Sequence, residues 1–258
     1  MERVGLFQKF HNMCCTIGEA LVFFGEVLTS IVQGKIRWNE VRKQVYEQGA
    51  QTIIIVVLTS LAAGAVLAMQ GYVSMSRFGA KEFVSHLVAL SLVRELGPVF
   101  TALIFSGKAG AKIAAELGTM NVNEQITATR AMGVDPMEFF VVPRMLASFM
   151  VLPLLAVIFE LVGMFGGYIV GIFQAHLPGS FYLSQTIRAI EFVDFFSGFI
   201  KVFFFAVIIS WICCYEGFKT RGGSLGVGQH TTNAVAYSYI LVIISNTFLT
   251  KFILTVWG

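Results

Sequence analysis

Charged residues are scarce in this chain of 258 residues: only 13% are Asp, Glu, Lys or Arg, whereas 56% are hydrophobic. A soluble globular domain has about 25% charged and roughly 45–50% apolar residues. The deficit argues against a water-soluble domain and indicates lipid as the main solvent. The formal net charge of +3 is spread through the loops and is too weak to indicate a nucleic-acid partner.

Cysteine and histidine are also sparse, with four residues of each. The cysteines form two adjacent pairs, Cys14 with Cys15 and Cys213 with Cys214. Adjacent cysteines cannot close a useful loop, and no CxxC spacing is present, so we expect reduced, buried packing residues. The histidines are scattered without an i, i+4 pair, so we predict no metal site.

Enzymatic signatures are missing as well. The tripeptide Ser106-Gly107-Lys108 ends like a nucleotide-binding P-loop, but Ala102 and Ala109 stand where that loop needs Gly and Ser or Thr. The run GGSLGVG at 222–228 does not match the dinucleotide fingerprint and is interpreted as a flexible cytoplasmic loop. No Ser/His/Asp set or carboxylate pair converges on one membrane depth, so we predict no catalytic residue and no cofactor on this chain.

Five long apolar stretches are present, and each is long enough to cross a bilayer, which takes about 20 helical residues. We predict transmembrane helices at 50–74, 83–118, 144–175, 194–216 and 233–257, with a polar connector before the first. The predicted fold is an all-α integral membrane protein forming a single membrane domain over 1–258. It has an N-terminal amphipathic interfacial helix, five transmembrane helices and a short cytoplasmic coupling helix between the second and third spans.

The N-terminal segment 5–33 is apolar but carries a polar stripe. Asn12, Glu19, Glu26 and Gln33 are spaced by seven, which keeps them on one helical face. We therefore expect an amphipathic helix lying in the membrane interface, since two carboxylates are costly on a lipid-exposed span. A genuine extra span is the alternative.

Lys and Arg gather on one side of the predicted spans: beside the N-terminal segment, in 108–144 and in 217–232. The positive-inside rule places this side in the cytoplasm, and an odd number of spans then puts the C-terminus on the outer side. We thus expect a multi-pass membrane protein with its N-terminus in the cytoplasm.

Arg94 and Glu95 follow the apolar run LVALSLV and precede Gly97 and Pro98. Ionised groups at such depth are costly, so they usually face a cavity, a pathway or each other. Pro98 removes a backbone hydrogen bond and tends to kink the helix, which would open a local pocket. Two interpretations stay open: a cavity-facing pair whose Arg binds a phosphate headgroup, or structural ion pairs to a neighbouring helix.

The cytoplasmic stretch from Asn121 to Pro136 predicts a short, separately capped helix over 121–133. Asn121 is the expected N-cap, Glu124 follows three residues later, Gly133 suits a left-handed C-terminal cap, and Pro136 prevents continuation. Such a rigid helix could receive force from a soluble motor. An ordinary hairpin connection is the alternative.

Two features of the third and fourth spans remain. Gly163, Gly167 and Gly171 repeat at four-residue spacing, which predicts a close packing face, within the chain or between subunits. Glu160 and Lys201 are buried charges that could pair at similar depth, and we assign neither a functional role.

Three blocks of sequence together resemble the MlaE (YrbE-like) permeases, a family of ABC-transporter subunits that move phospholipid across Gram-negative envelopes. They are AMQGY at 68–72, VALSLVRELGPVFTALIFSGKAGAKIAAELGTM at 88–120 and EQITATRAMGVDP at 124–136. The likeness extends more loosely over nearly the whole chain.

The resemblance implies a homodimer that binds two copies of a cytoplasmic ABC ATPase, which holds the ATP and Mg, a STAS-domain subunit and a periplasmic hexamer of MCE-domain proteins. It implies a place in the bacterial inner membrane with the C-terminus in the periplasm. It also implies transport that maintains outer-membrane lipid asymmetry and a phospholipid pocket at the dimer interface. Our candidate lipid-binding residues are Arg94, Glu95, Leu96, Leu67, Gln70, Ser74, Met75 and Phe78. The candidate ATPase-coupling residues are Glu124, Gln125, Ala128, Met132, Gly133 and Asp135.

Two rival functions remain at this point. One is a stand-alone intramembrane enzyme that modifies lipids with Glu95 as a base. The other is a secondary carrier driven by an ion gradient.

Overall fold

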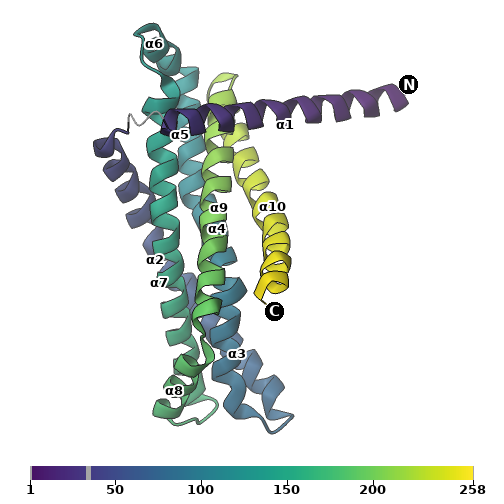
Figure 1. The fold of residues 1–258 in the computed structure, drawn as a ribbon, viewed down its shortest axis with the longest axis vertical. Helices are drawn as coiled ribbons and strands as arrows, with labels where there is room; N and C mark the ends of the chain where they lie inside the picture. Colours follow the sequence, from purple (N-terminus) through teal and green to yellow (C-terminus); the bar gives the residue numbers. More distant parts are fainter. Residues whose placement is uncertain (1, 33–35, 258) are drawn as a thin grey trace.

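The computed structural model describes residues 2–32 and 36–257, with side chains described for 15–16, 18–32 and 36–256. Over these residues the chain forms helices and no strand (Figure 1). The elements are α1 Glu2–Val32, α2 Trp38–Ser76, η1 Lys81–Phe83, α3 Val84–Ser91, η2 Leu92–Leu96, α4 Gly97–Phe105, η3 Ser106–Gly110, α5 Ala111–Val122, α6 Gln125–Ala131, η4 Met137–Val141, α7 Val142–Phe173, α8 Gly179–Ala189, α9 Phe192–Lys219 and α10 Gly223–Trp257. The η elements are a short 3-10 turn, η1, and the π-helical turns η2, η3 and η4.

Five helical segments are long and apolar enough to cross a membrane: Trp38–Ser76, Lys81–Val122, Met137–Phe173, Phe192–Lys219 and Gly223–Val256. The shortest has 28 residues, well above the roughly 20 that a bilayer requires. The predicted all-α class with five spanning helices is therefore confirmed. The polar connector before the first span is itself helical from Trp38 onward, because extending a helix costs far less than starting one.

Helix α1 lies across one end of the bundle and projects away from it (Figure 1). This arrangement agrees with the predicted interfacial helix and not with a sixth span. Its inner half is held by α9: the Trp211 indole donates to the Ala20 carbonyl at 2.9 Å, and the Phe23 ring packs edge-on against Tyr215. Glu19, from the predicted polar stripe, accepts hydrogen bonds from Lys219 and Tyr215, each at 3.2 Å.

The small-residue face of α7 packs against α2 within the same chain. A Cβ at Gly64 of α2 would overlap the carbonyl oxygen of Gly163, and one at Gly166 would overlap the carbonyl of Leu61. The predicted close packing is thus confirmed as a contact inside one chain, and the alternative that this face joins two subunits is wrong for Gly163. One turn further, Gly167 and Gly171 pack against Tyr182 of α8.

The glycine-rich run at 222–228 is not the flexible loop that its composition predicts. Only Gly222 and Gly223, with φ of 91° and 68°, form the turn, and α10 begins at Gly223. The long apolar segment that follows propagates the helix back through the remaining glycines, since propagation needs only one residue to be ordered for each hydrogen bond gained.

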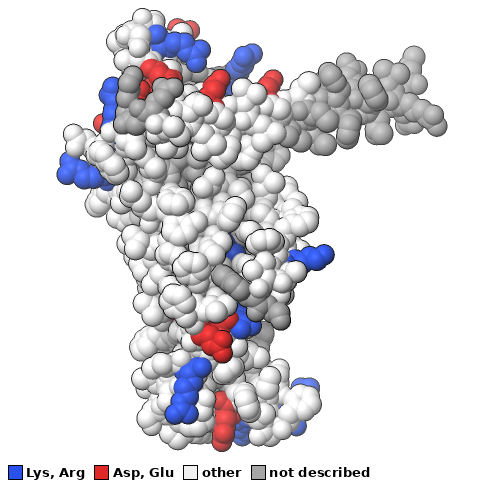
Figure 2. All heavy atoms as spheres, viewed as in Figure 1, with Lys and Arg blue, Asp and Glu red and all other residues white. Residues whose placement is uncertain are grey.

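The molecular surface reflects the membrane setting. Charged side chains gather toward both ends of the molecule, and few are visible in the broad band between them (Figure 2). Cys213 and Cys214 are free thiols buried in α9, as predicted. Cys15 is exposed instead of buried, because α1 packs on the bundle only through its inner half, and the Cys14 side chain lies outside the described residues.

Candidate functional site

A π-helical turn, η2, carries Arg94 and Glu95 in the middle of the second span. Pro98 follows in the first turn of α4 and has no N–H to donate to the carbonyl of Arg94, its normal helical acceptor. A mid-helix π turn adds one residue to the turn and is frequent at functional sites. Here it directs two adjacent charged side chains toward different partners.

Arg94 forms an ion pair with Asp194 at the start of α9. Its Nε and Nη2 both lie 2.6 Å from Oδ1 of Asp194. The other carboxylate oxygen of Asp194 accepts the backbone N–H of Glu191 at 3.2 Å in the capping box of α9, which holds the carboxylate in place. Asp194 is buried, whereas 49% of the Arg94 side chain is exposed, so the guanidinium retains free donors.

Glu95 is held by three side chains from α9 and α10. Lys201 donates to its Oε1 at 2.7 Å, Thr250 donates to the same oxygen at 3.0 Å, and Asn246 donates to Oε2 at 3.1 Å. Lys201 also donates to the Arg94 carbonyl at 2.9 Å and is only 2% exposed. We call this group the polar cluster; it consists of Arg94, Glu95, Asp194, Lys201, Asn246 and Thr250.

The predicted pair between Glu160 and Lys201 does not form. Lys201 faces η2 and binds Glu95, because Gly198, one turn earlier, lets α9 approach the carbonyl of Val93 with no Cβ in between. Glu160 lies on α7, with its Cγ 2.8 Å from the position that a Cβ of Gly97 would take. The two residues therefore contact opposite sides of the second span.

An open hollow adjoins the polar cluster beside Glu95. It has a volume of about 480 Å³, and α10 supplies the rest of its lining: Asn246, Thr247, Thr250, Lys251, Leu254 and Thr255. Both interpretations of the charged pair are thus partly realised. Arg94 and Glu95 each have a structural ion-pair partner, yet the Glu95 carboxylate still borders a space of ligand size.

The α2 candidates lie apart from the polar cluster within one chain. Gln70, Ser74 and Phe78 are exposed, while Leu67 and Met75 pack partly against the core, as does Leu96. Among the described residues, the side-chain polar contacts of Arg94 and Glu95 go to α9 and α10 and not to α2.

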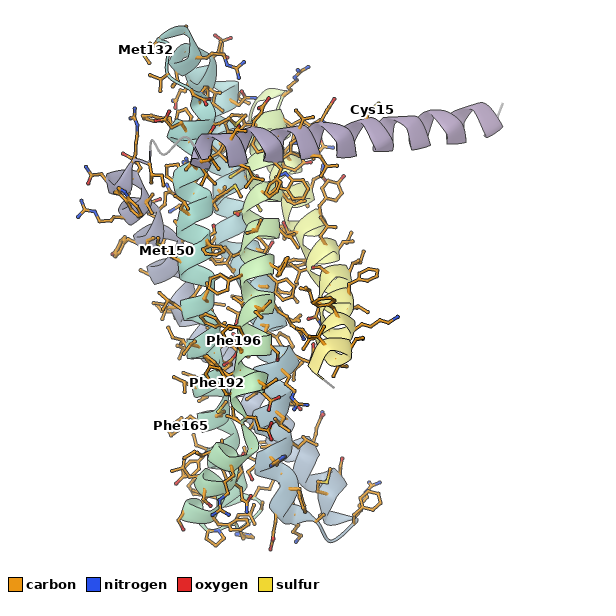
Figure 3. All side chains as sticks on the ribbon, viewed as in Figure 1. Cys15, Met132, Met150, Phe165, Phe192 and Phe196 are labelled. Atoms are coloured by element: carbon orange, nitrogen blue, oxygen red, sulfur yellow. The ribbon has the colours of Figure 1, made fainter. Side chains whose placement is uncertain are left out.

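The coupling candidates gather around α6, at the tip of the molecule beyond α1 (Figure 1). All six are exposed: Glu124, Gln125, Ala128, Met132, Gly133 and Asp135. Gly133 has a φ of 78°, as expected for a left-handed cap. Met132 is the most prominent apolar side chain there, 73% exposed, and lies at the tip in Figure 3.

The predicted N-cap at Asn121 is wrong. Helix α5 runs on to Val122, and the Asn121 amide instead donates to the carbonyls of Phe218 and Thr220, each at 2.9 Å. The carbonyls of Phe218 and Thr220 lie at the C-terminal end of α9, where backbone carbonyls have no partner within the helix. The Asn121 amide is bound to them and does not cap α6. Helix α6 is only seven residues long, Gln125–Ala131, and starts after Glu124 in a left-handed conformation with φ of 59°.

Three members of the polar cluster were missed in the sequence: Asp194, Asn246 and Thr250. A signal was available for the last two, since they are polar residues four apart in an apolar span and therefore share one helix face. Asp194 gave no such signal because it sits at the predicted boundary of its span.

The sequence is similar to a known family and to several individual proteins. The model of the family "Permease MlaE" matches residues 41–252. A "Probable ABC transporter permease protein" of Rickettsia bellii is 39% identical over 236 residues, which cover 92% of this chain and 91% of the relative. The "Intermembrane phospholipid transport system permease protein MlaE" of Haemophilus influenzae is 39% identical over 202 residues, 78% of this chain and 77% of the relative.

A plant relative is also similar. The chloroplastic protein TRIGALACTOSYLDIACYLGLYCEROL 1 of Arabidopsis thaliana is 33% identical over 231 residues, which cover 90% of this chain and 66% of that protein. On the strength of the family match and of these relatives, this chain belongs to the MlaE permease family.

Proposed function

We propose that this chain is the membrane-spanning permease subunit of an ABC transporter, and that it moves phospholipids between the inner membrane and a periplasmic carrier or the outer membrane. In this way it would maintain the lipid asymmetry of the outer membrane. The proposal is supported by the family and by the names of two relatives, a probable ABC transporter permease and a permease of an intermembrane phospholipid transport system. The observation that carries it is the polar cluster in the second span, bordered by an open hollow of about 480 Å³.

The half-exposed side chain of Arg94 is best suited to bind a phosphate. Arg binds phosphate oxygens through charge-assisted hydrogen bonds, and Asp194 occupies only one side of the fork. Glu95 borders the hollow, where the carboxylate and its amide and hydroxyl partners can contact the polar part of a lipid. The apolar side chains of α2 would hold the acyl chains.

A homodimer would bring the exposed α2 candidates of one copy close to the hollow beside Glu95 of the other. Within the described part of one chain, no polar contact joins the exposed α2 candidates to the hollow at α10. Only 6% of the most apolar stretch of α10 is buried. A two-fold interface buries the same patch on both copies and can enclose a cavity that neither copy encloses alone. The lipid site is thus proposed at such an interface.

ATP hydrolysis is assigned to a separate cytoplasmic ATPase, which holds the ATP and Mg. Helix α6 and its flanks are the proposed docking element, because they present exposed side chains at the end of the molecule that also carries α1. The same orientation puts the N-terminus in the cytoplasm and the C-terminus in the periplasm. The STAS-domain subunit and the periplasmic MCE-domain hexamer are further proposed partners, and they rest on the family alone.

The rival reading as a lipid-modifying enzyme receives no support from the site. Both carboxylate oxygens of Glu95 already accept hydrogen bonds, one of them from an ammonium group, so this residue is poorly placed to act as a general base.

The decisive experiment is affinity purification of the full chain in mild detergent. Co-purifying proteins are identified, bound lipids are extracted, and the complex is reconstituted in vesicles containing a fluorescent phospholipid. We expect a co-purifying ATPase and phospholipid movement that requires hydrolysable ATP. A non-hydrolysable analogue is the matched control. Movement or chemical conversion of phospholipid by the chain alone would overturn the proposal.

A further inference from the structure

A second cavity lies at a different place in the bundle, between α7 and α8. It has a volume of about 550 Å³, within the usual range of small-molecule sites. Its walls are almost entirely apolar and include Val157, Met164, Leu183 and Ile190. The polar cluster contributes no residue to it.

Glu160 is the one carboxyl group that lines this cavity. The residue is 6% exposed and lies near the middle of α7. Among the residues that the structure describes, it has neither a hydrogen bond nor an ion-pair partner, whereas Arg94 and Lys201 are engaged elsewhere. A carboxyl group at such depth is costly unless something binds it, and a carboxyl inside a membrane is by default a candidate functional group.

Tyr182 adds an independent observation on the opposite wall. The residue is 2% exposed, it lines the cavity, and its hydroxyl has no hydrogen-bond partner within the described part of the chain. The hydroxyl lies against Gly167, where a side chain would fill the space. Gly167 is two helical turns from Glu160 along α7, so Glu160 and Tyr182 line the same apolar cavity at different depths.

We infer that this cavity binds a single-chain amphiphile with a terminal ammonium group. The ammonium supplies the cation that Glu160 lacks, and the apolar walls hold one hydrocarbon chain. A carboxylate ligand brings no cation to Glu160, and a neutral alcohol can offer it only an uncharged hydrogen bond, which is weaker than a charge-assisted one.

The rim of the cavity permits entry from the bilayer. Leu161, Phe165, Leu183 and Ile187 line it and are also exposed apolar side chains. Phe165 lies on the outer side of α7 in Figure 3. An amphiphile dissolved in the membrane could therefore enter sideways. This inference does not depend on phospholipid transport and can hold or fail separately from it.

The test uses the full chain in lipid nanodiscs and three photoreactive probes with the same alkyl chain, ending in an amine, an alcohol or a carboxylate. Labelled peptides are mapped by mass spectrometry. We expect the amine to label segments 157–168 and 182–190 about 10-fold more than the alcohol, the factor that one charge-assisted hydrogen bond can supply. Glu160→Gln should reduce this ratio to about 1. Glu82→Gln, an exposed glutamate near the same end of the bundle, should leave it unchanged.

A competition experiment on the unaltered chain removes any dependence on how the variant folds. Unlabelled alkylamine should displace the amine probe from these segments, and the alcohol of equal length should not. Equal labelling by all three probes, labelling confined to other segments, or a preference that survives in Glu160→Gln would overturn the inference and leave an ordinary lipid-filled surface.

Discussion

The ammonium of Lys201 donates to the carbonyl oxygen of Arg94 at 2.9 Å, in place of the hydrogen bond that Pro98 cannot supply. The same ammonium binds the Glu95 carboxylate at 2.7 Å. Lys201 thus binds both the free carbonyl of Arg94 and the charged carboxylate of Glu95. The π-helical turn η2 therefore forms a single structural unit with Lys201 and Glu95.

Loss of this lysine should destabilise the bundle. Lys201→Met removes the cation from Glu95 and the donor from the Arg94 carbonyl, which should cost about 3 kcal/mol of unfolding free energy. Denaturant unfolding in mild detergent measures the change. Adding Glu95→Gln to Lys201→Met should recover part of the loss, because the uncompensated charge is then gone. Strict additivity of the two substitutions would show that they do not interact.

Arg94 should be required for lipid loading. Arg94→Gln removes the free guanidinium donors, and we expect the phospholipid that co-purifies with the complex to fall about 10-fold. The matched control is Asp194→Asn, which breaks the same ion pair but keeps the arginine, and which should retain bound lipid. Lipid extraction with quantitative mass spectrometry gives the readout. Equal loading in Arg94→Gln and the unaltered chain would remove Arg94 from the site.

Met132 should contribute to ATPase docking. Met132→Asp places a charge on the exposed apolar tip, and ATPase co-purification should fall at least about 10-fold, as for the loss of an interface hot spot. Phe83→Asp is a matched change of an exposed apolar residue in η1, at the opposite end of the bundle. That control should leave the ATPase bound. If both variants keep the ATPase, α6 is not the docking element.

Gly64 should tolerate no side chain. In Gly64→Ala the new Cβ would overlap the carbonyl oxygen of Gly163, so α2 and α7 must separate, at a cost of about 1–3 kcal/mol. Gly228→Ala is the control, since a Cβ there meets no atom within 4 Å and alanine favours a helix. Relative to the unaltered chain, the melting temperature should fall in Gly64→Ala and rise in Gly228→Ala. Equal stabilities would show that the two helices are not closely packed at this point.

The attachment of α1 should weaken in acid. The hydrogen bond and charge of Lys219, with a further hydrogen bond from Tyr215, lower the pKa of Glu19 below its ordinary 4.5. A lowered pKa in the folded state means that the contact is fully present above pH 4.5 and is lost as the pH falls through the lower, folded-state value. Hydrogen exchange of the inner half of α1 measures this loss.

Glu19→Gln should show faster exchange already at neutral pH, with little further change in acid. Glu26→Gln, on the same helix and likewise exposed, is the control and should behave like the unaltered chain. Identical exchange in all three forms at every pH would mean that the Glu19 contact does not hold α1.

The spanning helices could be read from the sequence because lipid imposes a simple requirement. Every backbone polar group must be bonded within its own helix, so apolar length alone marks a span. The stripe of Glu19 and Glu26 indicated a helix lying in the interface, because two carboxylates are costly on a lipid-exposed span. Gly133 could be predicted because only a local conformation, with φ of 78°, was at stake.

The partners of the buried charges could not be read in this way. Nothing in the sequence distinguishes Glu95 from Glu160 as the partner of Lys201, since the choice depends on how α9 is rotated and on its close approach at Gly198. The predicted cap at Asn121 was wrong because its partners also depend on how helices meet in space. Its amide binds a carbonyl at the end of α9, nearly a hundred residues away along the chain.

The sequence by itself determined that the chain is a helical membrane protein, where its spans lie and which charged residues they carry, because hydrophobicity and helical periodicity are local properties. Only the tertiary structure decided that Lys201 binds Glu95 and that the α7 glycines pack on α2. It also decided that Glu160 lines a cavity with no partner among the described residues. Those outcomes depend on the depth and rotation of helices that meet in space, and no local pattern encodes them.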